Sequence, residues 1–243
     1  GYRNCRVHKY APDGTLQSVS DGRDGAVDTS IVANGWKCGI PLAITFADGS
    51  TRSAAVGDLC TIDSTTDENG LSTSYTYDAA GRLASTNYPD EASLTYNNTR
   101  IAFEKVTASE FGISANHWRQ TIRTGNGIRQ TYFDALLRPL VEQSMDTADQ
   151  NTRSQVVKRY DAAGRVVYQS YPLRDPSLNY AFVDTGTYTS YDALGRPVEI
   201  LQDSELGPLQ TAIQYADGKR TLAGGLFFLL FILFILAATR ART

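Results

Sequence analysis

Four aspartates recur in similar settings along the chain, and paired carboxylates could carry out general acid and base catalysis. Asp78, Asp161 and Asp192 each follow a tyrosine and precede two small or apolar residues, a glycine and an arginine. Asp134 stands in a weaker copy of the same pattern. An aspartate at the first position of a β-turn accepts hydrogen bonds from the backbone that follows it. This structural role explains the aspartates without any chemistry, so we assign them to turns.

The two histidines give no stronger indication of catalysis. His8 and His117 lie in no recognisable nucleophile, metal or phosphate motif. A histidine next to a tryptophan, as His117 is next to Trp118, is more often a packing or surface residue than a general base. We therefore predict no catalytic residue, no metal ligand and no cofactor, and we do not expect an enzyme.

The three cysteines, Cys5, Cys38 and Cys60, all lie in the N-terminal part of the chain. Their spacings lack the close pairs of a zinc site. An odd number of cysteines in a chain that has few is a poor disulfide framework, which favours unpaired thiols in the sheet. One disulfide is conceivable, and Cys38 with Cys60 is then the preferred pair.

The aspartates belong to an internal repeat. Residues 160–165 read Tyr-Asp-Ala-Ala-Gly-Arg, nearly the same six residues stand at 77–82 and 191–196, and a weaker copy stands at 133–138. The copies recur at intervals of about thirty residues, with an interval about twice as long after the first copy, so one unit has lost its signature. Repeated units of this kind bury their apolar faces by stacking on their neighbours.

Each copy of the motif predicts a β-hairpin. The aspartate opens a type I turn and the glycine takes the left-handed position, which makes a three-residue loop closed by a bulge. The arginine then starts the outgoing strand beside the tyrosines of the incoming strand, where its guanidinium could rest on a ring. In the weaker copy Leu137 replaces the glycine, which should cost roughly 1 kcal/mol or force a different turn. We expect that hairpin to be the least regular.

The unit without a signature lies between residues 97 and 132. Side chains alternate from Trp118 up to the turn sequence Gly125-Asn126-Gly127, after which a second strand runs to Phe133. Residues 1–70 also favour short antiparallel strands over helices, and degenerate repeat units begin before residue 71. The turn dipeptides there are Asp13-Gly14, Asp21-Gly22, Asp24-Gly25, Asn34-Gly35, Asp48-Gly49 and Asn69-Gly70.

The pattern Tyr-Asp-Ala-x-Gly-Arg, together with the turn at residues 215–218, resembles the YD repeat of RHS proteins and teneurins. The resemblance covers residues 71–220 well and the N-terminal part weakly. It implies an all-β fold of repeated antiparallel β-hairpins, part of a sheet that spirals into a hollow shell. The framework positions that match the repeat transfer no catalytic role: Tyr77, Asp78, Gly81, Arg82, Phe133, Asp134, Arg138, Tyr160, Asp161, Gly164, Arg165, Tyr191, Asp192, Gly195 and Arg196.

The resemblance also implies a function. In bacterial members the shell often encloses a toxic C-terminal domain, so we expect a secreted or cell-surface structural scaffold that encapsulates or presents an effector absent from this chain. The expected partners are neighbouring repeats and the effector domain of a longer parent protein.

Two other functions were weighed against the scaffold. The 14 tyrosines support a carbohydrate-binding or adhesion module as the alternative, although the rings can equally pack within the sheet. An enzyme is the third choice. Nucleic acid is not an expected partner, because the formal charge is −3 and acidic and basic residues are interspersed.

We divide the chain into an N-terminal β segment at 1–70, the YD repeats at 71–220 and a hydrophobic tail at 221–243. The strand pattern stops after Arg220, and residues 221–239 carry no charge. As an apolar C-terminal helix they would span about 28 Å, close to the roughly 30 Å of a membrane core. A membrane anchor, a truncated or out-of-frame end, and a buried core segment stay open as interpretations of this tail.

Overall fold

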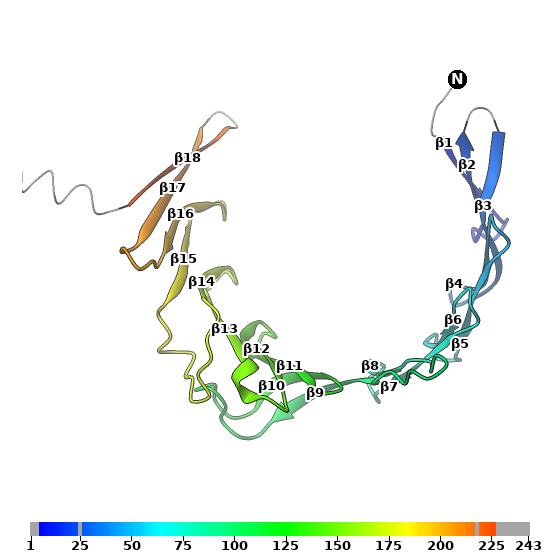
Figure 1. Ribbon diagram of the computed structural model, residues 1–243. Helices are drawn as coiled ribbons and strands as arrows, with labels where there is room; N and C mark the ends of the chain where they lie inside the picture. Colours follow the sequence, from blue (N-terminus) through cyan, green and yellow to red (C-terminus); the bar gives the residue numbers. More distant parts are fainter. Residues whose placement is uncertain (1–4, 24–25, 217–218, 227–243) are drawn as a thin grey trace, which may run out of the picture. The chain divides into compact units, whose positions relative to one another are not determined.

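The computed structural model describes residues 5–23, 26–216 and 219–226 (Figure 1). This part of the chain forms eighteen β-strands and one short 3-10 helix. Neighbouring strands in the sequence pair antiparallel, so the predicted all-β fold of consecutive hairpins is confirmed. The chain divides into two compact units, residues 1–101 with 123–125 (unit 1) and residues 102–122 with 126–243 (unit 2).

Unit 1 is a series of hairpins in which every strand pairs with the next one along the chain. Two further strands contribute residues to both units. The strands of unit 1 are β1 (Cys5–Tyr10), β2 (Leu16–Arg23), β3 (Ala26–Lys37), β4 (Ile40–Phe46), β5 (Thr51–Val56), β6 (Ile62–Thr66), β7 (Ser72–Tyr77) and β8 (Leu83–Asn87), and the shared strands are β9 (Thr99–Val106) and β10 (His117–Thr124).

Unit 2 continues the same pattern of antiparallel neighbours. A 3-10 helix, η1 (Gln150–Thr152), follows β12, and the side chain of Asp149 caps it by accepting from the backbone N–H of Asn151. The strands are β11 (Gly127–Phe133), β12 (Pro139–Asp146), β13 (Ser154–Tyr160), β14 (Val166–Ser170), β15 (Gly186–Tyr191), β16 (Pro197–Gln202), β17 (Leu209–Ala216) and β18 (Lys219–Leu226).

The unit that lacks the sequence signature is a hairpin, as predicted. Strand β10 ends at Thr124 and β11 begins at Gly127. Gly125, between them, has a φ of 56°, a left-handed conformation that glycine adopts without steric cost. The alternating pattern and the glycines of the turn therefore located this unit correctly.

Some of the turn dipeptides predicted in residues 1–70 lie in turns, and others lie inside strands. Turns do occur at Asp13-Gly14, Asp48-Gly49 and Asn69-Gly70. In contrast, Asp21-Gly22 lies inside β2 and Asn34-Gly35 lies inside β3, so those two predicted turns are wrong. Pairing with the neighbouring strand supplies the backbone hydrogen bonds there, and this outweighs the local turn preference. Asp24-Gly25 lies outside the described residues.

The turn after β3 lies instead at Cys38-Gly39, where both residues have positive φ, 53° and 76°. Two consecutive positive values of φ are the signature of the tight two-residue hairpin turn. Cysteine rarely occupies such a position, which is why the sequence pattern alone did not point to it.

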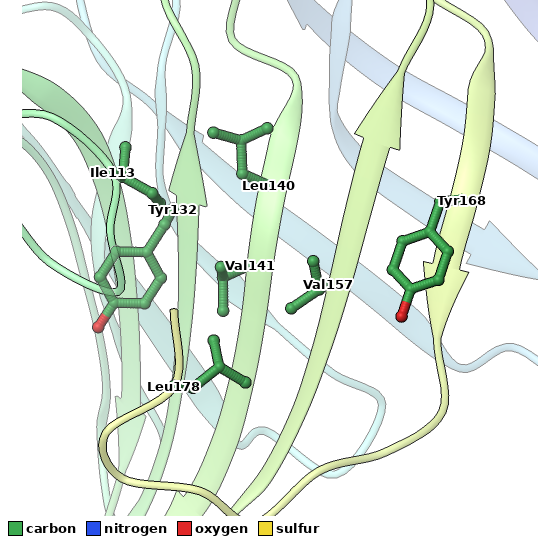
Figure 2. Packing of buried hydrophobic residues seen from close by; sticks show 7 residues of the cluster. All are labelled: Ile113, Tyr132, Leu140, Val141, Val157, Tyr168 and Leu178. Atoms are coloured by element: carbon green, nitrogen blue, oxygen red, sulfur yellow. The ribbon is translucent and has the colours of Figure 1, made fainter. Parts of the chain in front are cut away.

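The core of unit 2 lies on one face of strands β11 to β14 (Figure 2). Val141 and Val157 are opposite each other in the β12–β13 register and are 0% exposed. Tyr132 and Tyr168 extend the core to the flanking strands, and Ile113 and Leu178 cover it from two loops, as Figure 2 shows. Hairpins without helices thus obtain a buried core because long loops close over one sheet face.

The two covering loops are the β9–β10 loop, residues 107–116, and the β14–β15 loop, residues 171–185. They are bonded to each other, because the backbone N–H of Tyr180 donates to the carbonyl oxygen of Phe111 at 2.9 Å. A Cβ added to Gly112 would overlap the side-chain amide of Asn179, and Gly112 has a φ of 80°, so glycine is favoured at this close approach. The loops are therefore an integral layer of unit 2.

The C-terminal helix predicted from residue 221 onward is not observed for residues 221–226. They belong to β18, which pairs with β17 without interruption from Ala216 opposite Lys219 to Leu209 opposite Leu226. The adjacent strand offers a complete row of backbone partners, and apolar residues fit a strand as well as a helix. Residues 227–243 lie outside the described residues, and no helix in the described part is long and apolar enough to cross a membrane.

Candidate functional site

The repeated aspartates anchor their turns. Asp161 accepts the backbone N–H of Arg165 at Oδ1 (2.9 Å), and Arg165 Nε donates to Oδ2 (2.6 Å). The N–H of Gly164 donates to the Asp161 carbonyl, and Gly164 has a φ of 81°. The strand register shifts by one residue at Tyr160, which is the bulge expected beside a three-residue loop. Each element of the predicted turn is therefore present.

The other copies have the same geometry. The corresponding arginine bonds its aspartate through backbone N–H and Nε in the turns at 78–82, 134–138 and 192–196. Hydrogen bonds from the backbone N–H of the arginine are the largest influence that lowers the pKa of Asp78, Asp161 and Asp192 below its usual value. A carboxylate that stays ionised in this way suits a turn anchor, whereas a general acid needs a raised pKa.

The weaker copy is as regular as the others, so the prediction that it would be the least regular is wrong. Leu137 occupies the glycine position with a φ of 59° and still donates its N–H to the carbonyl of Asp134 at 3.1 Å. Its side chain is 52% exposed, so the leucine meets no crowding there. The bonds between Asp134 and Arg138 outweigh the roughly 1 kcal/mol cost of the left-handed leucine.

The arginines of the turns at 134–138, 161–165 and 192–196 lie over tyrosine rings, but each ring belongs to the next repeat. The guanidinium carbon of Arg138 is 4.8 Å from the ring centroid of Tyr160, and that of Arg165 is 4.8 Å from Tyr191. Arg196 lies 4.3 Å from the ring centroid of Tyr215. The sequence had predicted this contact within one hairpin. The distance between successive turns, which decides the partner, cannot be read from the sequence.

Hydrogen bonds in both directions complete the contacts of Arg138 with Tyr160 and of Arg165 with Tyr191. Arg165 Nη1 donates to the carbonyl of Asp192 at 3.2 Å, and the hydroxyl of Tyr191 donates back to the carbonyl of Val166 at 2.8 Å. Tyr160 makes the same return bond to Pro139 at 2.8 Å. We call this set of contacts, arginine over the next tyrosine with the bonds in both directions, the inter-repeat clamp. It joins consecutive turns along one rim of the sheet.

Unit 1 shows the clamp in reduced form. The hydroxyl of Tyr77 donates to the carbonyl of Ile62 at 2.8 Å, which is the return bond to the preceding turn, 57–61. That turn has the same backbone hydrogen bonds as the repeats, from Gly57 N–H to Thr61 and from Cys60 N–H to Gly57. The turns at 11–15, 46–50 and 67–71 share this bonding pattern. The backbone bonding of the repeat turns thus also occurs before residue 71.

Cys38 and Cys60 form a disulfide, so the interpretation that favoured unpaired thiols is wrong for these two residues. The preferred pair was the correct one. The bond links the β3–β4 turn to the turn at 57–61, and Cys60 stands at the glycine position of that turn with a φ of 62°. The odd number of cysteines had favoured unpaired thiols, but a cysteine count does not show which turns lie side by side.

His117 is part of the packing of unit 2. Its side chain is 3% exposed, its Nε2 is 3.2 Å from Glu110 Oε2 and its Nδ1 is 3.0 Å from the carbonyl of Ser114. Glu110 also accepts from Arg119 Nη1 at 2.6 Å, so its carboxylate bridges His117 and Arg119. His8 is exposed on β1, next to the ring of Tyr10. Within the described residues, no group of three or more His, Cys, Asp or Glu could hold a metal ion.

The tyrosines are divided between core, clamp and surface. Tyr132 and Tyr168 are 2% and 1% exposed in the core. Tyr88 and Tyr96 are more than two-fifths exposed and line an open groove of about 510 Å³ in unit 1, together with Asp67 and Glu91. The ring packing expected within the sheet is thus found in unit 2.

Residues 62–93 match the family model of the RHS repeat. The chain carries the RHS repeat. This agrees with the resemblance recognised from the motif Tyr-Asp-Ala-x-Gly-Arg, and the match includes the turn at 78–82. No curated protein matches the chain.

Solved structures share the fold of this RHS-repeat chain. The crystal structure of TcdB2-TccC3-Cdc42 matches with a TM-score of 0.59 and 14% identity, and that of TcdB2-TccC3 without its hypervariable C-terminal region with 0.50 and 13%. Both matches cover 90% of this chain and 12% of the other. The Photorhabdus luminescens Tc holotoxin pore gives 0.48 and 15%, covering 89% of this chain and 12% of that one. The chain thus spans about an eighth of the length of these proteins.

Proposed function

We propose that this chain is a structural segment of an RHS-repeat shell that encloses or presents a C-terminal effector domain of a longer parent protein. The inter-repeat clamp is the observation that carries the proposal. In the repeat at 160–165 Asp161 holds the turn, Arg165 contacts the next repeat and Tyr160 bonds to the preceding one. Residues used in this way extend a sheet, and each added hairpin offers the same contacts to the next.

The comparisons support the proposal through the fold. The structures that match with TM-scores of 0.59 and 0.50 both contain TcdB2-TccC3, and one of them is described as lacking a hypervariable C-terminal region. A scaffold that carries a variable C-terminal part is consistent with an effector attached to the repeats. Because this chain spans 12% of those proteins, the enclosed effector and its toxicity belong to the proposal.

The proposed role is non-catalytic, and the proposed location is outside the producing bacterium or at its surface. The partners are the neighbouring repeats and the effector domain. Neither glycan binding nor a membrane partner gains support from the comparisons. The apolar core and the clamps need only other repeats of the same kind to continue the sheet.

The test is protection of the effector in the full-length parent protein. Limited proteolysis of the intact parent should leave the C-terminal effector uncut under conditions that digest the isolated effector within minutes. A proline at Val157, which is 0% exposed in the centre of β13, should open the sheet and expose the effector to the protease.

The matched control places proline at Arg174, which is exposed in the β14–β15 loop outside any strand. That variant should protect the effector as well as the unaltered parent does. Equal digestion of the effector in the unaltered parent and in isolation would show that the repeats form no enclosure.

A further inference from the structure

Two exposed turns of unit 1 are joined covalently. Cys38 lies in the β3–β4 turn and Cys60 in the turn at 57–61, and both residues are exposed. Both also have positive φ, 53° and 62°, a conformation that side-chain-bearing residues rarely adopt. A thiol in solution can therefore approach the disulfide, and the bond joins two turns whose cysteines occupy a strained backbone conformation.

The disulfide stands where unit 2 uses an inter-repeat clamp. In the turn at 57–61 Thr61 occupies the arginine position, and Val56 precedes the turn where the repeats have tyrosine. Lys37, the last residue of β3 before the Cys38-Gly39 turn, donates to the carbonyl of Val56 at 2.9 Å and to Asp58 Oδ1 at 2.8 Å. Like the bond from Arg165 to Asp192, these bonds connect two turns, but Val56 stands where the repeats have the tyrosine ring.

Without the covalent bond, the link between these two turns is weak. The Asp58 side chain is fully exposed, so its ion pair with Lys37 is screened by water and contributes little. The amino group of Lys37 is also a point charge without the planar fork of arginine. The disulfide consequently supplies most of the connection at this position, and the next repeat is tied to it through the bond from Tyr77 to Ile62.

We propose that Cys38 and Cys60 form a thiol–disulfide exchange site that acts as a redox latch in unit 1. A thiolate of a dithiol reductant attacks one Sγ, the S–S bond breaks, and the other cysteine sulfur leaves as a thiolate that takes up a proton. The second thiol of the reductant then resolves the mixed disulfide. The protein gains two thiols, the reductant becomes a disulfide, and the two turns separate.

The latch confines redox sensitivity to unit 1. All three cysteines of the chain lie at or before residue 60, so the clamps of unit 2 do not depend on thiol chemistry. The inference goes beyond the proposed scaffold function. A scaffold stable in an oxidising exterior would loosen at one defined place on meeting a reducing compartment.

Hydrogen–deuterium exchange of the full chain, with and without dithiothreitol, tests the latch. Alkylation and mass measurement of the same samples count the free thiols. Reduction should raise the exchange rate of residues 37–62 by about tenfold or more and leave residues 127–160 unchanged. A disulfide that stays oxidised in native protein, or a reduction that leaves residues 37–62 as protected as before, would overturn the proposal.

Two variants make the result specific. The chain with Cys38→Ser and Cys60→Ser should exchange rapidly over residues 37–62, and dithiothreitol should not change its exchange rate. The chain with Cys5→Ser keeps the disulfide and should respond to the reductant like the unaltered protein, which excludes a contribution of Cys5. If the double variant does not fold, reduction and reoxidation of the Cys5→Ser chain still decides the question. Protection that does not return on reoxidation would contradict a reversible latch.

Discussion

The guanidinium of Arg165 lies over the ring of Tyr191, 4.8 Å from its centroid, although the two residues belong to different repeats. The hydroxyl of Tyr191 donates a hydrogen bond to the carbonyl of Val166, the residue that follows the arginine. The repeat signature therefore describes a contact between neighbours as much as a turn. Its aspartate and glycine shape one hairpin, and its tyrosine and arginine connect that hairpin to the hairpins before and after it.

Replacing Arg165 by methionine should lower the free energy of unfolding by about 1–3 kcal/mol, because the ring contact and the bonds to Asp161 and Asp192 are lost together. Arg165→Lys should recover only part of the loss, since lysine keeps the charge without the planar fork. Urea denaturation of the full chain measures both variants. Arg174→Met, on an exposed loop, is the control and should change stability by less than about 0.5 kcal/mol. Equal stability of the two methionine variants would mean that the clamp contributes nothing.

The glycine position of the turn should respond in opposite directions in two repeats. Gly164→Val forces a β-branched residue to a φ of 81° and should destabilise by about 1–3 kcal/mol. Leu137→Gly removes a left-handed leucine whose side chain is half exposed, and should stabilise by up to about 1 kcal/mol. Denaturation midpoints compare the two variants. A stabilising valine or a clearly destabilising glycine would show that φ is not what limits these turns.

Three glutamines form a row of hydrogen bonds across β11, β12 and β13, of which Gln143 and Gln155 are buried. Gln155 Nε2 donates to Gln143 Oε1 at 3.0 Å, and Gln143 Nε2 donates to Gln130 Oε1 at 3.1 Å. Gln143→Met should cost about 1–3 kcal/mol, because it strands the amide of Gln155, which is 0% exposed.

A second substitution among these glutamines shows why Gln143→Met destabilises the protein. Adding Gln155→Met to Gln143→Met should restore part of the stability, since no buried amide is then left without its partner. Gln169→Met, exposed on β14, serves as the control for the composition change. If the double variant lost more unfolding free energy than the two single variants lose together, burial of unpaired amides would not be the source of the loss.

Stability should fall in alkaline solution because of two core tyrosines. Burial raises the pKa of Tyr132 and of Tyr168 to about 12, and Tyr168 is affected further by Tyr188. In the unfolded chain these tyrosines ionise at a pKa of about 10, whereas in the folded protein they stay protonated up to about 12. The free energy of unfolding is therefore unaffected by them below about pH 10 and falls as the pH rises from about 10 to about 12. Urea denaturation across this range, with tyrosinate absorbance followed in parallel, measures the loss. Tyr132→Phe should reduce the alkaline loss, whereas Tyr88→Phe, at an exposed position, should not alter it.

Local chemistry explains what could be predicted from the sequence. Asp161 and Gly164 determine their turn through bonds within five residues, so the loop, its bulge and the left-handed glycine follow from residue types alone. The hairpin around Gly125 was predicted for the same reason, because strand alternation and turn glycines are local signals.

Contacts between distant residues were decided only by the tertiary structure. Which ring receives Arg165, whether Cys38 reaches Cys60, and whether residues 221–226 pair with β17 all depend on the separation of turns and strands in space. Likewise, the loops that carry Ile113 and Leu178 have no periodic pattern that would mark them as the cover of a core. The physical reason is that turn preference is a property of a few consecutive residues, whereas strand pairing and packing depend on the whole set of neighbours that the folded chain brings together.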